Sequence, residues 1–394
     1  MAERFEILVL NQISPVGLKR LPAESYSVTK DSARPDAILV RSADMHSMPI
    51  GDSVKAIGRA GAGTNNIPVP AMSRRGIPVF NAPGANANAV KELVLAGLLI
   101  AARNLVPAVQ YVVGLQGDDA ARSKKIEDEK KRFAGIELPG HTLGVVGLGK
   151  IGSLIADAAI RLGMNVLGYD PEITVDAAWS LPSQVRKAHS IEEVLRGSHF
   201  VTLHVPLNGA TRGLINARSL AHLRPGAILL NFSREGIVDE AAIVEALDSH
   251  RVKNYVTDFP SAALAGHAGV VALPHLGAST REAEDNSAIM VVDQVREYLE
   301  HGQVRNAVNF PDVFMQRESP YRVAIANANV PNMLGQMSTA MAKAGLNIHN
   351  MLNKSRGEMA YTLVDVDSPV PAAAIDTIRR IEGVLAIRYL PLDG

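Results

Sequence analysis

The sequence contains no cysteine among its 394 residues. This excludes disulfides, thiolate nucleophiles, zinc–thiolate sites and iron–sulfur clusters, and it favours a reducing, cytoplasmic compartment. Net charge is also lacking, because 40 Lys and Arg residues balance 40 Asp and Glu residues. The balance argues against a protein that binds nucleic acid by attraction to phosphate.

Long hydrophobic runs are absent as well. The most apolar stretch, residues 94–102, is VLAGLLIAA, whereas a helix that spans a bilayer needs about 20 residues. We therefore predict a buried helix there and no association with membranes.

The residues that are present predict a globular α/β chain of two to three domains, at about 150 residues per domain. Residues 1–90 alternate short β-rich runs with helical stretches, a pattern typical of a parallel sheet. Residues 88–113 predict one long helix. Residues 117–140 are densely charged. They predict a solvated helix or loop, or alternatively a contact with another subunit or its active site.

The later part of the chain shows two further patterns. From residue 143, apolar runs end in polar or glycine-rich turns, with helical segments between most of them. This predicts a doubly wound domain with ligands at the carboxyl ends of its strands. After residue 317 the order is strand, helix, strand, strand, helix, strand, which predicts a small ferredoxin-like domain.

A GxGxxG motif formed by Gly147, Gly149 and Gly152 follows one predicted strand and opens a helix. The glycines allow a tight turn, a close approach of pyrophosphate and close helix–strand packing. Asp170 ends the next strand, where it can bind ribose hydroxyls and repel a 2′-phosphate. The motif predicts an NAD site that includes Lys150 and Ile151; the alternative is a glycine-rich turn without a ligand.

Arg234 and His275 each follow a predicted strand of this same domain. Arginine binds a carboxylate through two hydrogen bonds, and histidine can accept a proton near neutral pH. The pair predicts oxidation of a hydroxy acid. A surface arginine and a core histidine remain the alternative interpretation.

The motifs VRSADM, GAGTNN, LGVVGLGKIG, NFSREGIVDE and LPHLGAST, with their surroundings, cover most of residues 40–311. Together they resemble the D-isomer-specific 2-hydroxyacid dehydrogenases, and among these the members that oxidise 3-phospho-D-glycerate with NAD in serine synthesis. The resemblance implies a flavodoxin-like substrate domain at residues 1–92 and 284–316, and a Rossmann cofactor domain at residues 93–283. Residues 317–394 resemble an ACT regulatory domain.

The resemblance also implies roles for individual residues. Arg234 and His275 match the catalytic arginine and the catalytic acid/base. The positions implied to bind substrate are Arg41, Ser42, Arg59, Gly61, Ala62 and Gly63, although Arg59 can equally be a surface residue. Further positions implied on the cofactor side are His204, Val205, Pro206, Ser233, Asp258 and Gly277.

One departure concerns the glutamate that the family pairs with its histidine. Ala262 and Ala263 occupy its expected positions, and no acid lies between Asp258 and His275. Asp258, or Thr257 one position earlier, matches an aspartate near the nicotinamide. Because of this departure, a non-enzymatic regulator that senses NAD remains an alternative. The enzymatic alternatives are reduction of glyoxylate or hydroxypyruvate, and oxidation of another D-2-hydroxy acid.

The ACT resemblance implies a serine effector bound between paired domains by Asn327, Asn329 and Asn347. The alternative is a tail that only mediates dimerisation. The family resemblance further implies a homodimer or homotetramer, and no metal is expected.

Overall fold

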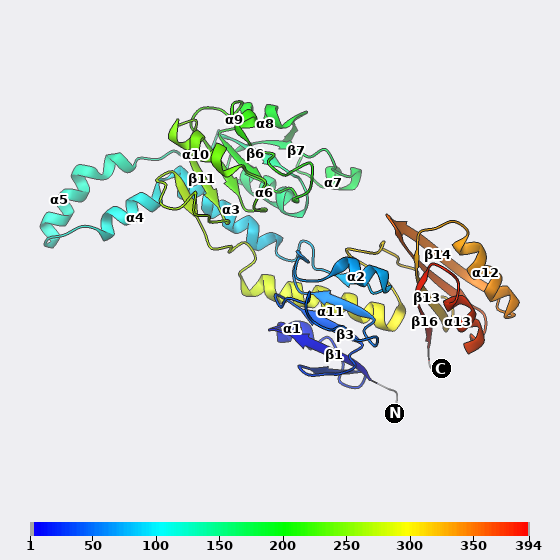
Figure 1. Cartoon of the computed structure of the whole chain (residues 1–394). Helices are drawn as coiled ribbons and strands as arrows, with labels where there is room; N and C mark the ends of the chain where they lie inside the picture. Colours follow the sequence, from blue (N-terminus) through cyan, green and yellow to red (C-terminus); the bar gives the residue numbers. More distant parts are fainter. Residues whose placement is uncertain (1–3, 393–394) are drawn as a thin grey trace. The chain divides into compact units, whose positions relative to one another are not determined.

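The computed structural model describes residues 4–392 and forms two compact units (Figure 1). The first unit joins Met1–Asn86 to Arg281–Gly394, and the second is Ala87–Thr280. The boundaries of the two units fall at residues 86/87 and 280/281. They coincide with the starts of two long helices, because a continuous helix is rigid and belongs to one unit as a whole.

A five-stranded parallel sheet forms the N-terminal part of the first unit, in the order β2-β1-β3-β4-β5. This is the flavodoxin-like order expected above. The strands are β1 (Phe5–Leu10), β2 (Tyr26–Thr29), β3 (Ala37–Val40), β4 (Ala56–Arg59) and β5 (Val79–Phe80). The helices are α1 (Pro15–Leu18), α2 (Val69–Arg74) and the long α11 (Arg281–His301), which packs on β4.

The C-terminal part of the first unit, called the C-terminal module below, has the predicted βαββαβ order. Its antiparallel sheet runs β14-β15-β13-β16, the ferredoxin-like arrangement. The elements are β13 (Tyr321–Ala328), α12 (Met333–Lys343), β14 (Ile348–Arg356), β15 (Met359–Val366), α13 (Ala372–Arg379) and β16 (Val384–Pro391).

The two faces of the module's sheet are buried in different ways. Val323 and Ile325 point to the side covered by α12 and α13. Ala324 and Ala326, which alternate with them, join one hydrophobic core with residues of the N-terminal part, including Tyr298. The module is therefore fused to the substrate-side sheet through a continuous core.

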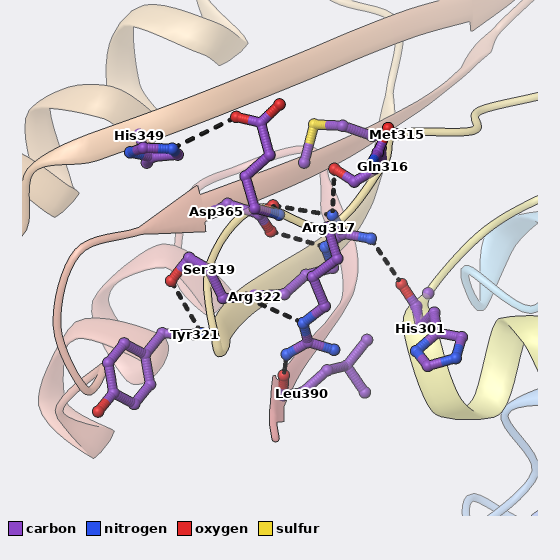
Figure 2. A network of polar contacts seen from close by, with 12 residues as sticks. His301, Met315, Gln316, Arg317, Ser319, Tyr321, Arg322, His349, Asp365 and Leu390 are labelled. Carbon is purple, nitrogen blue, oxygen red and sulfur yellow. Dashed lines mark hydrogen bonds and ion pairs between the residues drawn. The ribbon is translucent and has the colours of Figure 1, made fainter. Parts of the chain in front are cut away.

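A buried ion pair supports this junction (Figure 2). Arg322 and Asp365 have fully buried side chains and form two parallel hydrogen bonds, of 2.7 and 2.8 Å. Arg322 also donates to the carbonyls of His301 and Gln316. The guanidinium thus connects the module's sheet to the end of α11.

The second unit contains a parallel seven-stranded sheet in the order β12-β11-β10-β9-β6-β7-β8, which is the Rossmann order. The strands are β6 (Thr142–Val146), β7 (Asn165–Tyr169), β8 (Val185–Lys187), β9 (Phe200–Leu203), β10 (Ala227–Asn231), β11 (Val252–Thr257) and β12 (Val270–Ala272). The covering helices are α3 (Ala87–Ala102), α6 (Lys150–Arg161), α7 (Val175–Trp179), α8 (Ile191–Gly197), α9 (Ala217–Leu220) and α10 (Glu240–Asp248).

The prediction of a single helix over residues 88–113 is wrong. Helix α3 ends at Ala102, and α4 (Leu105–Val113) follows at an angle of 68°. Asn104 between them adopts a left-handed conformation with φ +50°, which ends a right-handed helix. The apolar run 94–102 does form one face of a buried helix, through Val94, Leu98 and Ala101.

Beyond the break, α4, α5 (Asp119–Glu129) and a 3-10 turn at Lys130–Phe133 form an arm that extends away from the sheet of its unit (Figure 1). The charged segment is indeed a solvated helix, with no buried residue in α5. Within residues 4–392, no single helix has the length and hydropathy to cross a membrane, although the bent pair α3–α4 passes by length and composition when taken together.

Candidate active site

The glycine loop connects β6 to α6 with the geometry that its sequence predicts. Gly147 has φ +91°, and a Cβ there would lie 2.6 Å from the carbonyl oxygen of His204. A Cβ on Gly152 would lie 1.9 Å from the carbonyl oxygen of Gly147. Both positions therefore require glycine, because any Cβ would clash with the protein's own backbone.

Gly149 has no such internal reason, since a Cβ there would meet nothing within 4 Å. It is the N-cap of α6 and supplies no side-chain cap to the helix. The open space therefore faces a helix N-terminus, which favours a negatively charged phosphate group. Gly149, Lys150 and Ile151 thus fit the pyrophosphate of a dinucleotide.

Asp170 lies beside the same loop, at the end of β7. Its carboxylate accepts hydrogen bonds from the backbone N–H of Leu148 at 2.8 Å and of Glu172 at 2.9 Å. These bonds fix the negative charge next to the glycine loop. The spacing between the motif and the acid, read from the sequence, therefore corresponds to a contact in space.

The loop after β9 forms the other side of this switch point, where the strand order reverses between β6 and β9. The hydroxyl of Ser233 donates to the carbonyl of Val205, so the loops after β9 and β10 are tied together. Burial lowers the pKa of His204 to about 3, and its ring stays neutral. Its Nε2 lies 2.8 Å from Thr202 Oγ1, whereas its Nδ1 is buried without a partner. Pro206 follows on the exposed part of the loop.

Arg234, Asp258 and His275 follow β10, β11 and β12, three neighbouring parallel strands. The carboxyl ends of parallel strands meet at one edge of a sheet, so all three residues lie along the edge that carries the glycine loop. Arg234 is exposed, with Nη1 donating to the carbonyl of Ser233 at 2.7 Å.

His275 is exposed and has φ +55°. A non-glycine residue in this left-handed region carries strain, which the surrounding structure must hold in place. The Asp258 carboxylate does so, because it accepts hydrogen bonds from the N–H groups of Leu276 at 2.7 Å and Gly277 at 2.8 Å. Asp258 is therefore a positioning residue for the loop that presents the imidazole.

The imidazole itself has no acidic partner among the described residues of its own unit. It contacts the ring of Phe259 edge-on, with centroids 5.2 Å apart, and Asp258 is occupied by the backbone. Ala262 and Ala263 are both exposed. The second unit thus contains no counterpart of the missing glutamate within the described chain.

In the first unit, the substrate-side residues gather at the carboxyl ends of β3 and β4. Arg59 Nε donates to the carbonyl of Arg41 at 3.0 Å. Gly61 has φ +148°, and a Cβ there would lie 1.8 Å from Nη1 of Arg59. The guanidinium therefore packs directly against the glycine turn, so Arg59 is not an isolated surface residue. Ser42 is exposed beside it.

Two neighbours of this cluster were not anticipated from the sequence. Glu284 in the first turn of α11 pairs with Arg41 at 2.7 Å. Asn81 donates to the carbonyl of Ala62 at 2.6 Å and so supports the Gly61–Ala62–Gly63 turn. Nothing local to Glu284 distinguishes it from an ordinary acid at a helix start, and Asn81 lies in a loop whose sequence does not show that it supports the turn.

The three asparagines of the C-terminal module do not lie together within one chain. Asn329 bonds to the backbone of Gly357 and Glu358 before β15, whereas Asn347 bonds to Asp367 after β15. The intervening strand separates them by about 25 Å at ~3.3 Å per residue. The side chain of Asn327 is buried, and its Oδ1 has no partner.

No group of three or more His, Asp or Glu side chains within residues 4–392 is arranged to hold a metal ion. The described edge brings together arginine, histidine and backbone donors, beside a loop that fits a dinucleotide.

A parallel Rossmann unit with this loop, in a chain that also contains a flavodoxin-like unit, defines a two-domain α/β dehydrogenase fold. Residues 99–277 match the model of the D-isomer specific 2-hydroxyacid dehydrogenase, NAD binding domain. The chain is 30% identical over 352 residues to D-3-phosphoglycerate dehydrogenase of Escherichia coli K12, a match that covers 86% of this chain and 82% of that protein. The chain belongs to the D-isomer-specific 2-hydroxyacid dehydrogenase family, and its second unit is the NAD-binding domain.

Two further relatives agree with this assignment. D-3-phosphoglycerate dehydrogenase of Synechocystis is 36% identical over 327 residues, which are 79% of this chain and 56% of that protein. The chain thus spans about half the length of that relative. The NAD+-bound 3-phosphoglycerate dehydrogenase of Entamoeba histolytica superposes with a TM-score of 0.61 and 25% identity, covering 79% of this chain and 100% of that chain.

Proposed function

We propose that the protein oxidises 3-phospho-D-glycerate to 3-phosphooxypyruvate with NAD, the entry reaction of serine synthesis, in the cytoplasm. The observation that carries the proposal is the edge formed by β10, β11 and β12. It presents Arg234 and a strained His275 beside a loop fitted to a dinucleotide. The relatives' names supply the substrate class.

Separate groups of the chain bind the substrate and accept its proton. The Arg234 guanidinium binds the substrate carboxylate through two hydrogen bonds. The N–H groups of Ala62 and Gly63, which have no acceptor among the described residues, suit an anionic group of the substrate. The neutral imidazole of His275 accepts the proton of the C2 hydroxyl. NAD, when bound, supplies the hydride acceptor.

One cluster in the substrate unit favours a phosphorylated substrate over glyoxylate or hydroxypyruvate. Arg41 and Arg59 are adjacent in the substrate unit, joined through the hydrogen bond from Arg59 to the carbonyl of Arg41. Two guanidinium groups beside the carboxylate turn suit a phosphate, with Ser42 as a further donor. Arg41, which now pairs with Glu284, would exchange this ion pair for one with the substrate phosphate.

The test is NADH formation at alkaline pH with 3-phospho-D-glycerate, and with D-glycerate and D-lactate as phosphate-free controls. We expect turnover with the phosphorylated acid and at least tenfold lower kcat/KM with the controls. Equal rates would favour a general D-2-hydroxyacid dehydrogenase. If none of the three acids is oxidised although the protein binds NAD, the result would favour a non-enzymatic, NAD-sensing regulator.

Variants of the two key side chains refine the test. His275→Ala should lower kcat about 10²–10⁴-fold, because it removes proton transfer. Arg234→Ala should raise KM as well as lower kcat, because its contact is present in the ground state and in the transition state. A His275→Ala enzyme within threefold of wild type would contradict the acid/base role.

We also propose that the C-terminal module is an ACT domain that binds serine. Since Asn329 and Asn347 lie at opposite ends of β15, a complete site requires modules from two chains, with Asn329 of one near Asn347 of the other. Calorimetry should detect serine binding at millimolar concentration or tighter in wild type and none in Asn347→Ala. Absence of heat in wild type would leave the module a structural element.

A further inference from the structure

A cavity of about 940 Å³ lies within the first unit, at the junction of the five-stranded sheet and the C-terminal module. Its walls come from β1 and from loops near residues 34–36, 52–55 and 75–77 on one side. On the other side they come from β16 and the end of α13. None of the residues assigned above to substrate, cofactor or serine lines it.

The cavity is strongly basic. The cations that line it are Arg4, Arg34, Lys55, Arg75, Arg379 and Arg388. The carboxylates of Glu6, Asp36 and Asp52 leave a formal excess of three positive charges. Charges of one sign around a concave, protein-walled space reinforce one another and concentrate ions of the opposite sign.

Some of these cations are already engaged. Lys55 pairs with Asp36, and Arg75 bonds to the carbonyls of Ile50 and Gly51. Arg388 donates to the carbonyls of Tyr298 and Leu299 at the end of α11. These contacts fix the floor of the cavity.

Three cations, Arg4, Arg34 and Arg379, remain available, and of these Arg34 and Arg379 lie on opposite walls. The guanidinium of Arg34 has no acceptor among the described residues. Arg379 has only an exposed ion pair with Asp376, 2.6 Å long and three residues away on the same helix. Exposed pairs of this kind contribute little free energy, so a ligand can replace the contact.

The walls approach each other closely next to the cavity, which shows that the junction is a packed surface. Gly76 has φ +69°, and a Cβ there would lie 2.7 Å from the Cβ of Ala386 in β16. Arg388 also stacks over the ring of Tyr298, 4.7 Å from its centroid. The cavity is thus bordered by fixed contacts between the sheet and the module, and its size is that of small-molecule sites.

We propose that this cavity binds a small polyanion, a molecule with two or more phosphate or carboxylate groups. The ligand bridges Arg34 of the substrate side and Arg379 of the module. Such a ligand stabilises the junction between the module and the sheet that carries Arg41 and Arg59. The module thereby has an effector site separate from the proposed serine site. The proposal does not depend on whether the chain oxidises phosphoglycerate.

The test is isothermal titration calorimetry of the full-length protein with tripolyphosphate and, separately, with citrate, at physiological ionic strength. The test variant is R34Q/R379Q, which removes one cation from each wall. A matched control is R196Q/R218Q, which removes two exposed arginines of the second unit. Arg234→Gln serves as a second control, because it removes the cation proposed to hold the substrate carboxylate.

We expect wild type and both controls to bind one probe per chain, and R34Q/R379Q to bind at least tenfold more weakly. Preference for tripolyphosphate or for citrate then identifies phosphate or carboxylate as the recognised group. Three results would overturn the proposal: no binding to wild type, undiminished binding to R34Q/R379Q, or loss of binding in Arg234→Gln. Circular dichroism of each variant checks that the fold is retained.

Discussion

Individual residues of the second unit show how strain and charge are held at the candidate active site. His275 occupies a left-handed conformation because Asp258 binds the two following N–H groups. This arrangement occupies the last acidic residue before His275 in the sequence. Among the described residues of the second unit, the imidazole then has no acidic partner. The departure from the family's histidine–glutamate pair thus has a consequence for the pH dependence of the reaction.

Installing a glutamate tests this consequence. Ala262→Glu and Ala263→Glu each place a carboxylate in the exposed loop expected to face His275 in relatives, and a nearby anion stabilises imidazolium. Oxidation requires neutral imidazole, so the acidic limb of the kcat/KM profile should move to higher pH, by about one unit if the pair gains ~1.4 kcal/mol. A glutamine at each position is the control. An unmoved limb in both variants would mean that another acid already pairs with His275.

We expect Asp170 to determine the choice between NAD and NADP in a similarly local way. Its carboxylate is fixed beside the glycine loop by two backbone hydrogen bonds, so it cannot easily turn away from a 2′-phosphate. We expect kcat/KM to be at least tenfold higher with NAD than with NADP. Asp170→Asn should lower the ratio of kcat/KM with NAD to kcat/KM with NADP, whereas Glu172→Gln should leave this ratio unchanged. Equal use of both cofactors by wild type would contradict this role for Asp170.

At the scale of secondary-structure elements, a buried ion pair and an exposed helical arm show two contrasting ways in which segments contact their surroundings. The ion pair of Arg322 and Asp365 is fully buried between β13, β15 and the end of α11. The arm of α4 and α5 has the opposite character, because neither helix has a buried residue.

Removing one partner of the buried pair should be costly. Asp365→Ala leaves an uncompensated guanidinium in the core, which typically costs about 3–5 kcal/mol. Asp376→Ala breaks the exposed pair with Arg379 and should change the free energy of unfolding by less than ~1 kcal/mol. Urea unfolding of both variants measures the difference. If Asp365→Ala lowers the free energy of unfolding by less than Asp376→Ala does, the ion pair of Arg322 and Asp365 is not buried in solution.

The arm should bind a second copy of the chain. Leu105, Val109, Val112 and Val113 of α4 are exposed, with Val109 at 61% and Val113 at 77%. Large apolar side chains that stay exposed along one helix are typical of a protein interface. V109D/V113D should convert a dimer into monomers in analytical ultracentrifugation, whereas Lys124→Asp on the polar arm should not. A wild-type monomer would contradict the proposed oligomer.

At the scale of the whole molecule, the continuous core between the module and the substrate-side sheet has a testable consequence. Ala324, Ala326 and Leu363 of the module share that core with Tyr298 and Phe310. Truncation after residue 316 would expose apolar surface of the remaining chain. We therefore expect the truncated protein to lose its cooperative thermal transition or aggregate, whereas Asn347→Ala melts like wild type. A truncated chain with an unchanged melting temperature would show that the module is a separable domain.

Sequence patterns alone were enough to predict the three sheets, the family and its NAD-binding domain. These features depend on local patterns: apolar runs of strand length, glycines at fixed spacing and an acid at the end of the next strand. Gly147, Gly152 and Asp170 could be recognised because each acts through a backbone constraint within one βαβ unit. The roles of Arg234 and His275 rested on family motifs and remain predictions.

Only the tertiary structure decided the features that depend on packing between distant segments. The break at Asn104 ended a helix whose apolar pattern continued, because a left-handed residue is not visible in that pattern. The pairing of Arg41 with Glu284 joins residues far apart in the chain. The separation of Asn329 from Asn347 follows from strand register, and the basic cavity follows from docking the module on the sheet. Contacts of this kind arise from the complementarity of folded surfaces, which local sequence patterns do not encode.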